Sequence, residues 1–136
     1  FYVDLFMLHY PNCWGNLCGG KQPEGTWKDS YRALEKLQKD RKIRAIGMSN
    51  VDVNLMKELV EFAEVKPQVV QVYSDPLRPN TEMQTFCAEH GIQFEAYSSL
   101  GTQWFWQLHR NPVLEHPVIN AIGQELGKSA AQVVLR

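Results

Sequence analysis

Short apolar runs alternate along the chain with longer amphipathic segments, and this alternation limits the folds that it can adopt. The first run, Val3 to Leu8, is followed by a segment capped by Thr26, in which Trp27, Tyr31 and Leu34 recur at helical spacing. Charged residues fill the other face of that segment, as in a helix packed on one side. The pattern then repeats, with strands expected at Ile43 to Met48, Val69 to Val72 and Ile92 to Tyr97, and helices from Asp52, at Thr81 to Glu89, at Val118 to Leu126 and from Ser129. A loop is expected between Tyr97 and the helix at Val118.

The spacing of the runs favours a parallel α/β fold. Successive runs begin about 23 to 40 residues apart, which suits parallel strands joined by helical crossovers. An open doubly wound sheet and part of a TIM (β/α)8 barrel both fit, but no glycine-rich phosphate motif follows any run, which weakens the first. A barrel needs about 200 residues or more. Because the chain begins inside a strand and stops inside a helix, we expect residues 1–136 to be one incomplete domain, a piece of a longer protein.

Charge and composition exclude several classes of partner. With 14 basic and 15 acidic side chains, the chain has no overall field that would attract nucleic acid or an anionic membrane. No apolar stretch of about 18 residues is present for a membrane span, and no signal-peptide pattern is seen. These observations favour a cytoplasmic protein with a small-molecule or protein partner. The cysteines Cys13, Cys18 and Cys87 lack the second Cys or His pair of a zinc site, so we expect reduced thiols and no metal.

Polar and aromatic side chains stand where each predicted strand ends. This edge carries the functional groups in parallel α/β proteins, because loops and helix N-termini converge there. Taken singly, a serine or asparagine here could cap the next helix, and a histidine or tyrosine could pack at the edge of a core. Gln71 lies between valines, where its amide can donate and accept across a cavity. Together the strand ends favour a site that contains His9, Tyr10, Ser49, Asn50, Gln71, Tyr97 and Ser98.

Five blocks of the sequence resemble, in order, the characteristic blocks of the aldo-keto reductases: "DLFMLHYP", "ALEKLQKDRKIRAIGMSNV", "KPQVVQV", "FCAEHGIQFEAYSSLG" and "AQVVLR". The resemblance covers nearly the whole chain. It implies a (β/α)8 barrel that binds NADPH, or alternatively NADH, without a Rossmann motif and reduces aldehydes and ketones. The chain would cover about the fourth to seventh strands. An unrelated barrel such as an aldolase would need a Schiff-base lysine at a strand end, and none of the four ends has one.

The resemblance assigns a catalytic role to His9 and a substrate contact to Tyr10, and the loop that follows adds Trp14 as a candidate. His9 matches the histidine that hydrogen-bonds the substrate carbonyl, and a neutral imidazole donor suits an oxygen that gains negative charge as hydride arrives. Tyr10 stands where many members place a tryptophan against the substrate. Trp14 lies in the long loop from Asn12 to Gly25, and long loops are often functional, so we expect it either to line the substrate pocket or to pack on its own loop.

The cofactor-binding roles also follow from the resemblance. Ser49, Asn50 and Gln71 match the residues that hold the nicotinamide carboxamide, whose amide and carbonyl need both donors and acceptors. Tyr97 matches the tyrosine that stacks on the nicotinamide ring. Ser98 and Leu100 match positions that approach the pyrophosphate. The usual "YSPLG" reads "YSSLG" here, so the loop loses a proline and we expect its stiffness to change.

The resemblance also implies partners that this chain lacks. The family's catalytic tyrosine, lysine and aspartate lie on earlier strands, so no general acid is assigned here. We expect the whole protein to be a monomeric NAD(P)H-dependent oxidoreductase. Residues 1–136 alone should be inactive, because half a barrel leaves two open sheet edges. The alternative is a cofactor-binding regulatory or channel-associated subunit with little turnover, and the presence or absence of the upstream tyrosine and lysine separates the two.

Overall fold

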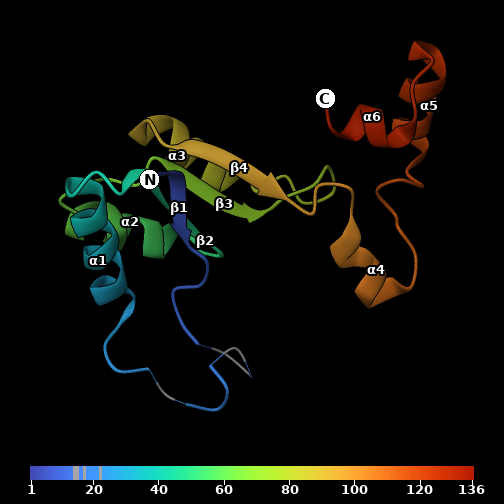
Figure 1. Ribbon diagram of the computed structural model, residues 1–136. Coiled ribbons are helices and arrows are strands. Elements are labelled where there is room, and N and C mark those ends of the chain that lie inside the picture. The colour runs from blue at the N-terminus through green and yellow to red at the C-terminus, as the bar shows by residue number, and fades with distance from the viewer. Residues whose placement is uncertain (14–15, 17, 22) are drawn as a thin grey trace. The chain divides into compact units, whose positions relative to one another are not determined.

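A computed structural model describes residues 1–13, 16, 18–21 and 23–136. Four strands form one sheet in the order β1-β2-β3-β4, in which β1 pairs in parallel with β2, and β2 with β3. The strands are β1 (Val3–Leu8), β2 (Ile43–Ser49), β3 (Val69–Tyr73) and β4 (Gln93–Tyr97), and the helices are α1 (Trp27–Lys39), α2 (Val53–Phe62), α3 (Thr81–His90), α4 (Thr102–Leu108), α5 (Pro117–Leu126) and α6 (Ala130–Val134) (Figure 1). The expected parallel α/β order is therefore confirmed. Within the described part of the chain, no helix is long and apolar enough to cross a membrane.

The contacts divide the chain into two compact units. The first contains residues 1–72 and 81–95, and the second contains residues 73–80 and 96–136. The first unit therefore holds β1, β2, α1, α2, α3 and most of β3 and β4. The second unit holds the loop after β3 together with the last residues of β4 and helices α4, α5 and α6.

Side-chain caps begin α1 and α2 where the sequence predicts them. Thr26 and Asp29 form a capping box at α1, in which the Thr26 backbone N–H donates to Asp29 Oδ2 at 2.7 Å and Lys28 N donates to Thr26 Oγ1 at 3.2 Å. These bonds from Thr26 hold the pKa of the Asp29 carboxyl below its ordinary value. Asp52 caps α2 by accepting from Leu55 N at 2.8 Å. Each cap satisfies backbone donors that the first helical turn leaves unpaired.

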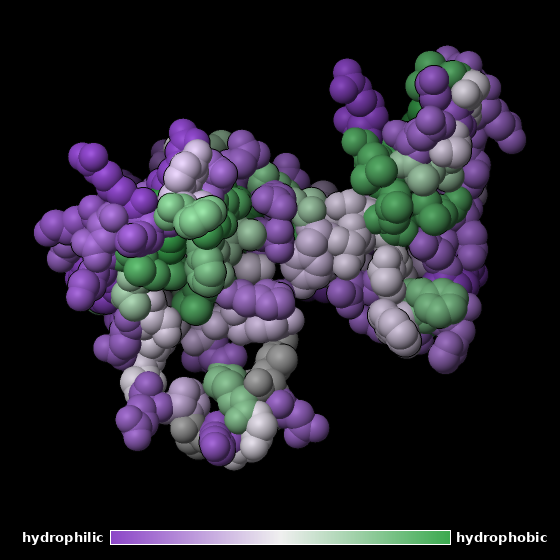
Figure 2. Space-filling model, viewed as in Figure 1, coloured by the Kyte–Doolittle hydropathy of each residue, from purple (hydrophilic) through white to green (hydrophobic). Residues whose placement is uncertain are grey.

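The core of the first unit lies between the sheet and its helices α1, α2 and α3. Its fully buried members come from both layers and include Tyr31, Ile46, Met48, Met56, Leu59, Val70 and Met83. Strand β1 differs, because Val3 and Phe6 remain 47% and 50% exposed. Apolar atoms are visible at the surface of each unit in Figure 2, and in the second unit the exposed apolar residues include Val118, Leu126 and Leu135.

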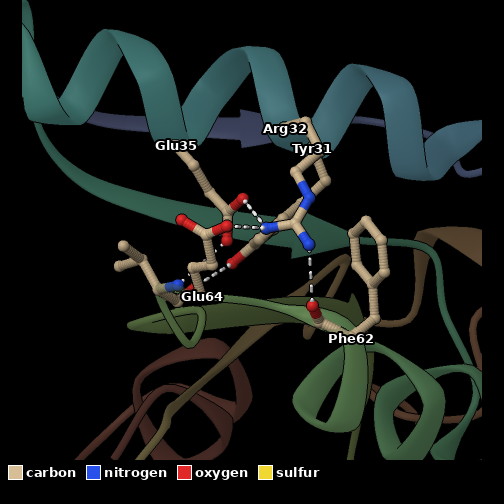
Figure 3. A network of polar contacts seen from close by, with 6 residues as sticks. Tyr31, Arg32, Glu35, Phe62 and Glu64 are labelled. Carbon is tan, nitrogen blue, oxygen red and sulfur yellow. Dashed lines mark hydrogen bonds and ion pairs between the residues drawn. The ribbon is translucent and has the colours of Figure 1, made fainter.

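A buried carboxylate joins α1 to the C-terminal end of α2 (Figure 3). Glu35 is buried, and its Oε1 accepts from Val65 N at 2.9 Å while its Oε2 accepts from Arg32 Nη1 at 2.8 Å. Arg32 also donates to the backbone oxygen of Phe62 at 3.3 Å and lies over its ring. The exposed Glu64 is a second partner of Arg32, at 3.2 Å. The network thus fixes the helix pair through one buried and one exposed acid.

Replacing Glu35 with glutamine is expected to destabilise the protein by about 1 to 2 kcal/mol, because a charge-assisted bond to Arg32 is replaced by an amide N–H facing a guanidinium. Denaturant unfolding of the protein that contains this chain measures this. Glu64→Gln is the matched control, since its side chain is 81% exposed and pairs with the same arginine. We expect that control to change stability by less than about 0.5 kcal/mol. Equal effects of the two variants would contradict the importance of the buried acid.

Candidate functional site

Polar groups join the carboxyl ends of β2 and β3 in the first unit. Ser49, the last residue of β2, is 2% exposed, and its Oγ donates to the backbone oxygen of Gln71 at 2.9 Å. The same oxygen accepts from Asn50 N at 3.1 Å. The register places Ser49 opposite Gln71. The sheet therefore brings these three predicted residues together.

Asn50 links this pair to the end of β1. Its φ is +55°, in the left-handed region that asparagine tolerates better than most residues. This turn directs its Nδ2 to the backbone oxygen of His9 at 2.8 Å, and Nδ2 also lies 3.2 Å from Ser49 Oγ. The four predicted residues at the ends of β1, β2 and β3, namely His9, Ser49, Asn50 and Gln71, are thus connected by hydrogen bonds in one unit.

Gln71 has a partner that the sequence analysis missed. Its Nε2 donates to Glu95 Oε1 at 2.7 Å. A sequence signal exists, because Glu95 is a carboxylate within the strand "QFEAY". Its assignment to Gln71 needs the relative register of β3 and β4, which no local pattern supplies. The bond fixes which end of the Gln71 amide is the donor toward β4 and leaves Oε1 without a hydrogen bond from the described residues.

His9 and Tyr10 line a pocket in the first unit. The pocket encloses about 1000 Å³ and is lined on other sides by the starts of α1 and by Glu58 of α2. The imidazole of His9 is exposed and stacks on the ring of Tyr10, with centroids 4.3 Å apart and planes at 28°. Lys28 and Glu58 form an ion pair of 2.6 Å in the pocket wall. An imidazole presented to an open pocket can donate a hydrogen bond to a ligand there. Trp14, the other predicted substrate contact, lies outside the described residues.

The expectation of reduced thiols is wrong for two cysteines. Cys13 and Cys18, which also line the pocket, form a disulfide with Cα atoms 5.8 Å apart, a normal separation for such a bond. The spacing of the cysteines excluded a zinc site, but it did not test whether two cysteines of one loop form a disulfide. Cys87 is free and buried in α3, and burial raises the pKa of its thiol. No group of three His, Cys, Asp or Glu side chains suited to a metal occurs among the residues that the structure describes.

The remaining predicted residues belong to the second unit. Tyr97 ends β4, and its ring lies 6.1 Å from that of Tyr73 at an angle of 44°. Ser74 N donates to the backbone oxygen of Tyr97 at 3.3 Å. Burial, followed by the hydrogen bond to Asp75, raises the pKa of the Tyr73 hydroxyl well above its ordinary value. Tyr97 is therefore bordered by the segment after β3.

The turn after Tyr97 is tightly built. Ser98 has a φ of +54°, and the backbone oxygen of Leu100 accepts from Asn111 Nδ2 at 2.7 Å. Gly101 has a φ of +83°, and a Cβ there would meet Asn111 Oδ1 at 2.6 Å. The expectation of a loop up to Val118 is wrong for residues 102–108, which form α4. That helix has a glycine at its N-cap and no side-chain cap bond, so the usual sequence signal is absent.

Comparison with known proteins shows the family. The chain matches the family model of the Aldo/keto reductase family over residues 1–136. It is 41% identical over 135 residues to a glyoxal reductase of Bacillus subtilis, covering 99% of this chain and 42% of that protein. It is 37% identical over 157 residues to the NAD(P)H-dependent D-xylose reductase of Scheffersomyces stipitis, covering 99% and 49%. The chain belongs to the aldo-keto reductase family.

A solved structure agrees with this assignment. The crystal structure of an aldo-keto reductase complexed with NADPH matches with a TM-score of 0.83 and 26% identity, covering 97% of this chain and 41% of that one. The chain thus has the fold of part of the aldo-keto reductase (β/α)8 barrel, as the sequence predicted. It spans less than half the length of the curated relatives described above.

Proposed function

We propose that the protein containing this chain is an NAD(P)H-dependent oxidoreductase that reduces aldehyde or ketone carbonyls to alcohols. The observation that carries this proposal is the hydrogen-bonded group His9, Ser49, Asn50 and Gln71 at the ends of three neighbouring strands. The bond to His9 is made by its backbone oxygen, so the group joins the end of β1 to the hydroxyl of Ser49 and the amide of Asn50 at the end of β2. The family match over the whole chain supports the same function.

The side chains present fit a nicotinamide carboxamide. That group has one carbonyl acceptor and one NH₂ donor, so its site needs both kinds of partner. Asn50 Nδ2 already donates to the His9 backbone oxygen, Ser49 Oγ to that of Gln71, and Gln71 Nε2 to Glu95, so the fit rests on the Gln71 carbonyl as an acceptor for the NH₂ group. The Nε2 of Gln71 donates to Glu95, while the Oε1 of the same amide receives no hydrogen bond from the described residues. We therefore assign carboxamide binding to these three residues.

His9 would act on the substrate. A nicotinamide held by Ser49, Asn50 and Gln71 would supply the hydride for carbonyl reduction, and His9 would donate a hydrogen bond to the carbonyl oxygen as it gains negative charge. An N–H of His9 donated to that oxygen stabilises this charge more than the ground state, which lowers the barrier. Tyr10 keeps the imidazole in place by stacking on it at 4.3 Å. We assign Tyr10 to the substrate side of this pocket and, from the sequence alone, propose Trp14 as a further substrate contact.

In the second unit, Tyr97 would stack on the nicotinamide ring, and Ser98 and Leu100 would lie beside the pyrophosphate. Support comes from the tight turn that follows Tyr97 and from its fixed left-handed Ser98. We propose NADPH as the preferred cofactor, since one similar structure is a complex with NADPH and one relative is named an NAD(P)H-dependent reductase. Residues 1–136 would form one incomplete domain of the barrel.

We also propose that the protein is a monomer located in the cytoplasm. The Cys13–Cys18 disulfide bears on this point, because a reducing cytoplasm tends to open such bonds. Fractionation of cells combined with thiol labelling tests the compartment and the state of the pair together. Size-exclusion chromatography of the purified protein tests the monomer.

The function itself is tested by steady-state assays of the protein with NADPH and an aromatic aldehyde. We expect NADPH oxidation whose rate saturates with both the NADPH and the aldehyde concentration. Tight NADPH binding without turnover would instead favour the regulatory or channel-associated subunit. Neither binding nor turnover with any carbonyl would refute both functions.

Replacing Gln71 with alanine is expected chiefly to weaken the cofactor. Loss of its hydrogen bonds to the carboxamide should raise the Kd for NADPH about 10-fold, which corresponds to about 1.4 kcal/mol. Turnover at saturating NADPH should fall much less. Quenching of protein fluorescence measures the Kd, and Gln93→Ala, which removes an exposed amide from the same sheet, is the control. A large loss of turnover with an unchanged Kd would contradict the assignment.

A further inference from the structure

The loop after β3 is organised around one buried carboxylate in the second unit. Asp75 is 4% exposed, and its Oδ1 accepts from Leu77 N at 2.8 Å and from Arg78 N at 3.0 Å. Its Oδ2 accepts from Trp104 Nε1 at 2.9 Å and from the hydroxyl of Tyr73. Both oxygens are therefore engaged, and the carboxylate is held in one orientation.

The two bonds to Oδ2 come from side chains outside the loop's own turn. Tyr73 is the last residue of β3, and Trp104 lies on α4, 29 residues after Asp75. The guanidinium of Arg78 lies 5.5 Å from the centre of the Tyr73 ring but is not an ion-pair partner of Asp75 in the described structure. A local turn needs only the backbone donors of Leu77 and Arg78. The two bonds to Oδ2 therefore connect the turn to the end of β3 and to α4.

The Tyr73 bond reaches Tyr97. The hydroxyl of Tyr73 is fixed by Asp75, and its ring then lies 6.1 Å from the ring of Tyr97, tilted by 44°. The adjacent Ser74 N holds the backbone oxygen of Tyr97. Rotation of the Tyr73 ring would remove one wall of the space that Tyr97 occupies. Asp75 therefore restrains Tyr97 without touching it.

The Trp104 bond reaches the turn after Tyr97. Trp104 N donates to the backbone oxygen of Gly101 at 3.1 Å, and Gly101 N donates to that of Ser98 at 2.9 Å. Trp104 is thus bonded to Asp75 through its indole N–H and to the turn of residues 98–101 through its backbone N–H. Helix α4 has no side-chain cap bond, and the Trp104 indole bond to Asp75 is a side-chain contact that holds its first turn.

We propose that Asp75 is a positioning residue for the cofactor, acting through Tyr73 on Tyr97 and through Trp104 on the turn that holds Ser98 and Leu100. The proposal rests on the function proposed above. Tyr73 and Trp104 donate the two bonds through which Asp75 acts. Removing either donor leaves a less ordered nicotinamide and pyrophosphate site in a protein that still folds.

The test uses Tyr73→Phe and Trp104→Phe in the protein that contains this chain, because each variant removes a donor to Oδ2 and keeps an aromatic ring. Each should raise the Kd and the KM for NADPH about 10-fold, with kcat changed less than about 3-fold. The double variant should raise the Kd for NADPH by less than the two single effects combined. Its Kd should be close to that of Asp75→Asn, since all of these variants disturb one carboxylate. Trp106→Phe is the matched control, because this side chain on the same helix is 74% exposed.

Two readouts separate a positioning role from a structural one. Thermal unfolding without cofactor reports stability, and fluorescence titration with NADPH reports affinity. Lower unfolding temperatures with unchanged NADPH affinity would overturn the proposal, as would equal effects of Trp104→Phe and Trp106→Phe. If the wild-type protein itself does not bind NADPH, the proposed function fails instead, and the two failures are thereby distinguished.

Discussion

Replacing His9 with alanine is expected to lower kcat by about 10² to 10³-fold, the usual cost of removing a donor to a developing oxyanion. The Kd for NADPH should change less than about 3-fold, because the cofactor residues are held by other bonds. The backbone oxygen of His9, which Asn50 engages at 2.8 Å, is retained in the variant. The imidazole is exposed, so its loss creates no cavity. Steady-state kinetics and NADPH titration measure the two effects.

Two further variants sharpen this result. His9→Gln keeps an N–H donor on a chain of similar reach, and it should recover part of the lost turnover. His109→Asn removes an exposed histidine at the C-cap of α4, where φ is +53° and asparagine is tolerated, and it should leave kcat unchanged. If His9→Ala weakened NADPH while sparing kcat, His9 would belong to the cofactor site and the catalytic assignment would be lost.

The parts of the fold that local chemistry determines were predictable from the sequence. The caps Thr26 and Asp52 mark the first turns of α1 and α2, and the apolar run from Val3 to Leu8 coincides with β1. Helix α4 was missed because its N-cap is Gly101 in the left-handed region, with no side-chain acceptor to signal it. Prediction thus succeeded where a side chain carries the signal and failed where the backbone alone does.

The candidate site shows the same division. Ser49, Asn50 and Gln71 could be named because strand ends can be located from hydrophobic runs. The pairing of Gln71 with Glu95, and of Asp75 with Trp104, could not, because each joins residues 24 or 29 positions apart. Such contacts depend on strand register and helix placement. The disulfide between Cys13 and Cys18 was missed for a different reason, since it depends on the path of a single loop.

Gly47 of β2 lies in the middle of the sheet, where its neighbours leave no room for a larger side chain. This residue pairs with Met7 on one side and with Val69 on the other. A Cβ at Gly47 would lie 2.6 Å from the backbone oxygen of Val69 and 2.8 Å from Cγ of Met7. The methionine side chain can move, but the carbonyl of a paired strand cannot withdraw without breaking the ladder. The glycine is therefore required for close approach of the strands.

Gly47→Ala is expected to destabilise the protein by about 3 kcal/mol, at the upper end of the range for overpacking. Denaturant unfolding measures the change, and Arg44→Ala in the same strand is the control. The ion pair of Arg44 with Asp4 has both side chains mostly exposed, so its loss should cost less than about 1 kcal/mol. Because Ser49 and Asn50 lie two and three residues after Gly47, a strand displaced here should also weaken NADPH binding in the folded fraction. A stable Gly47→Ala protein with normal NADPH affinity would contradict the requirement for glycine at this position.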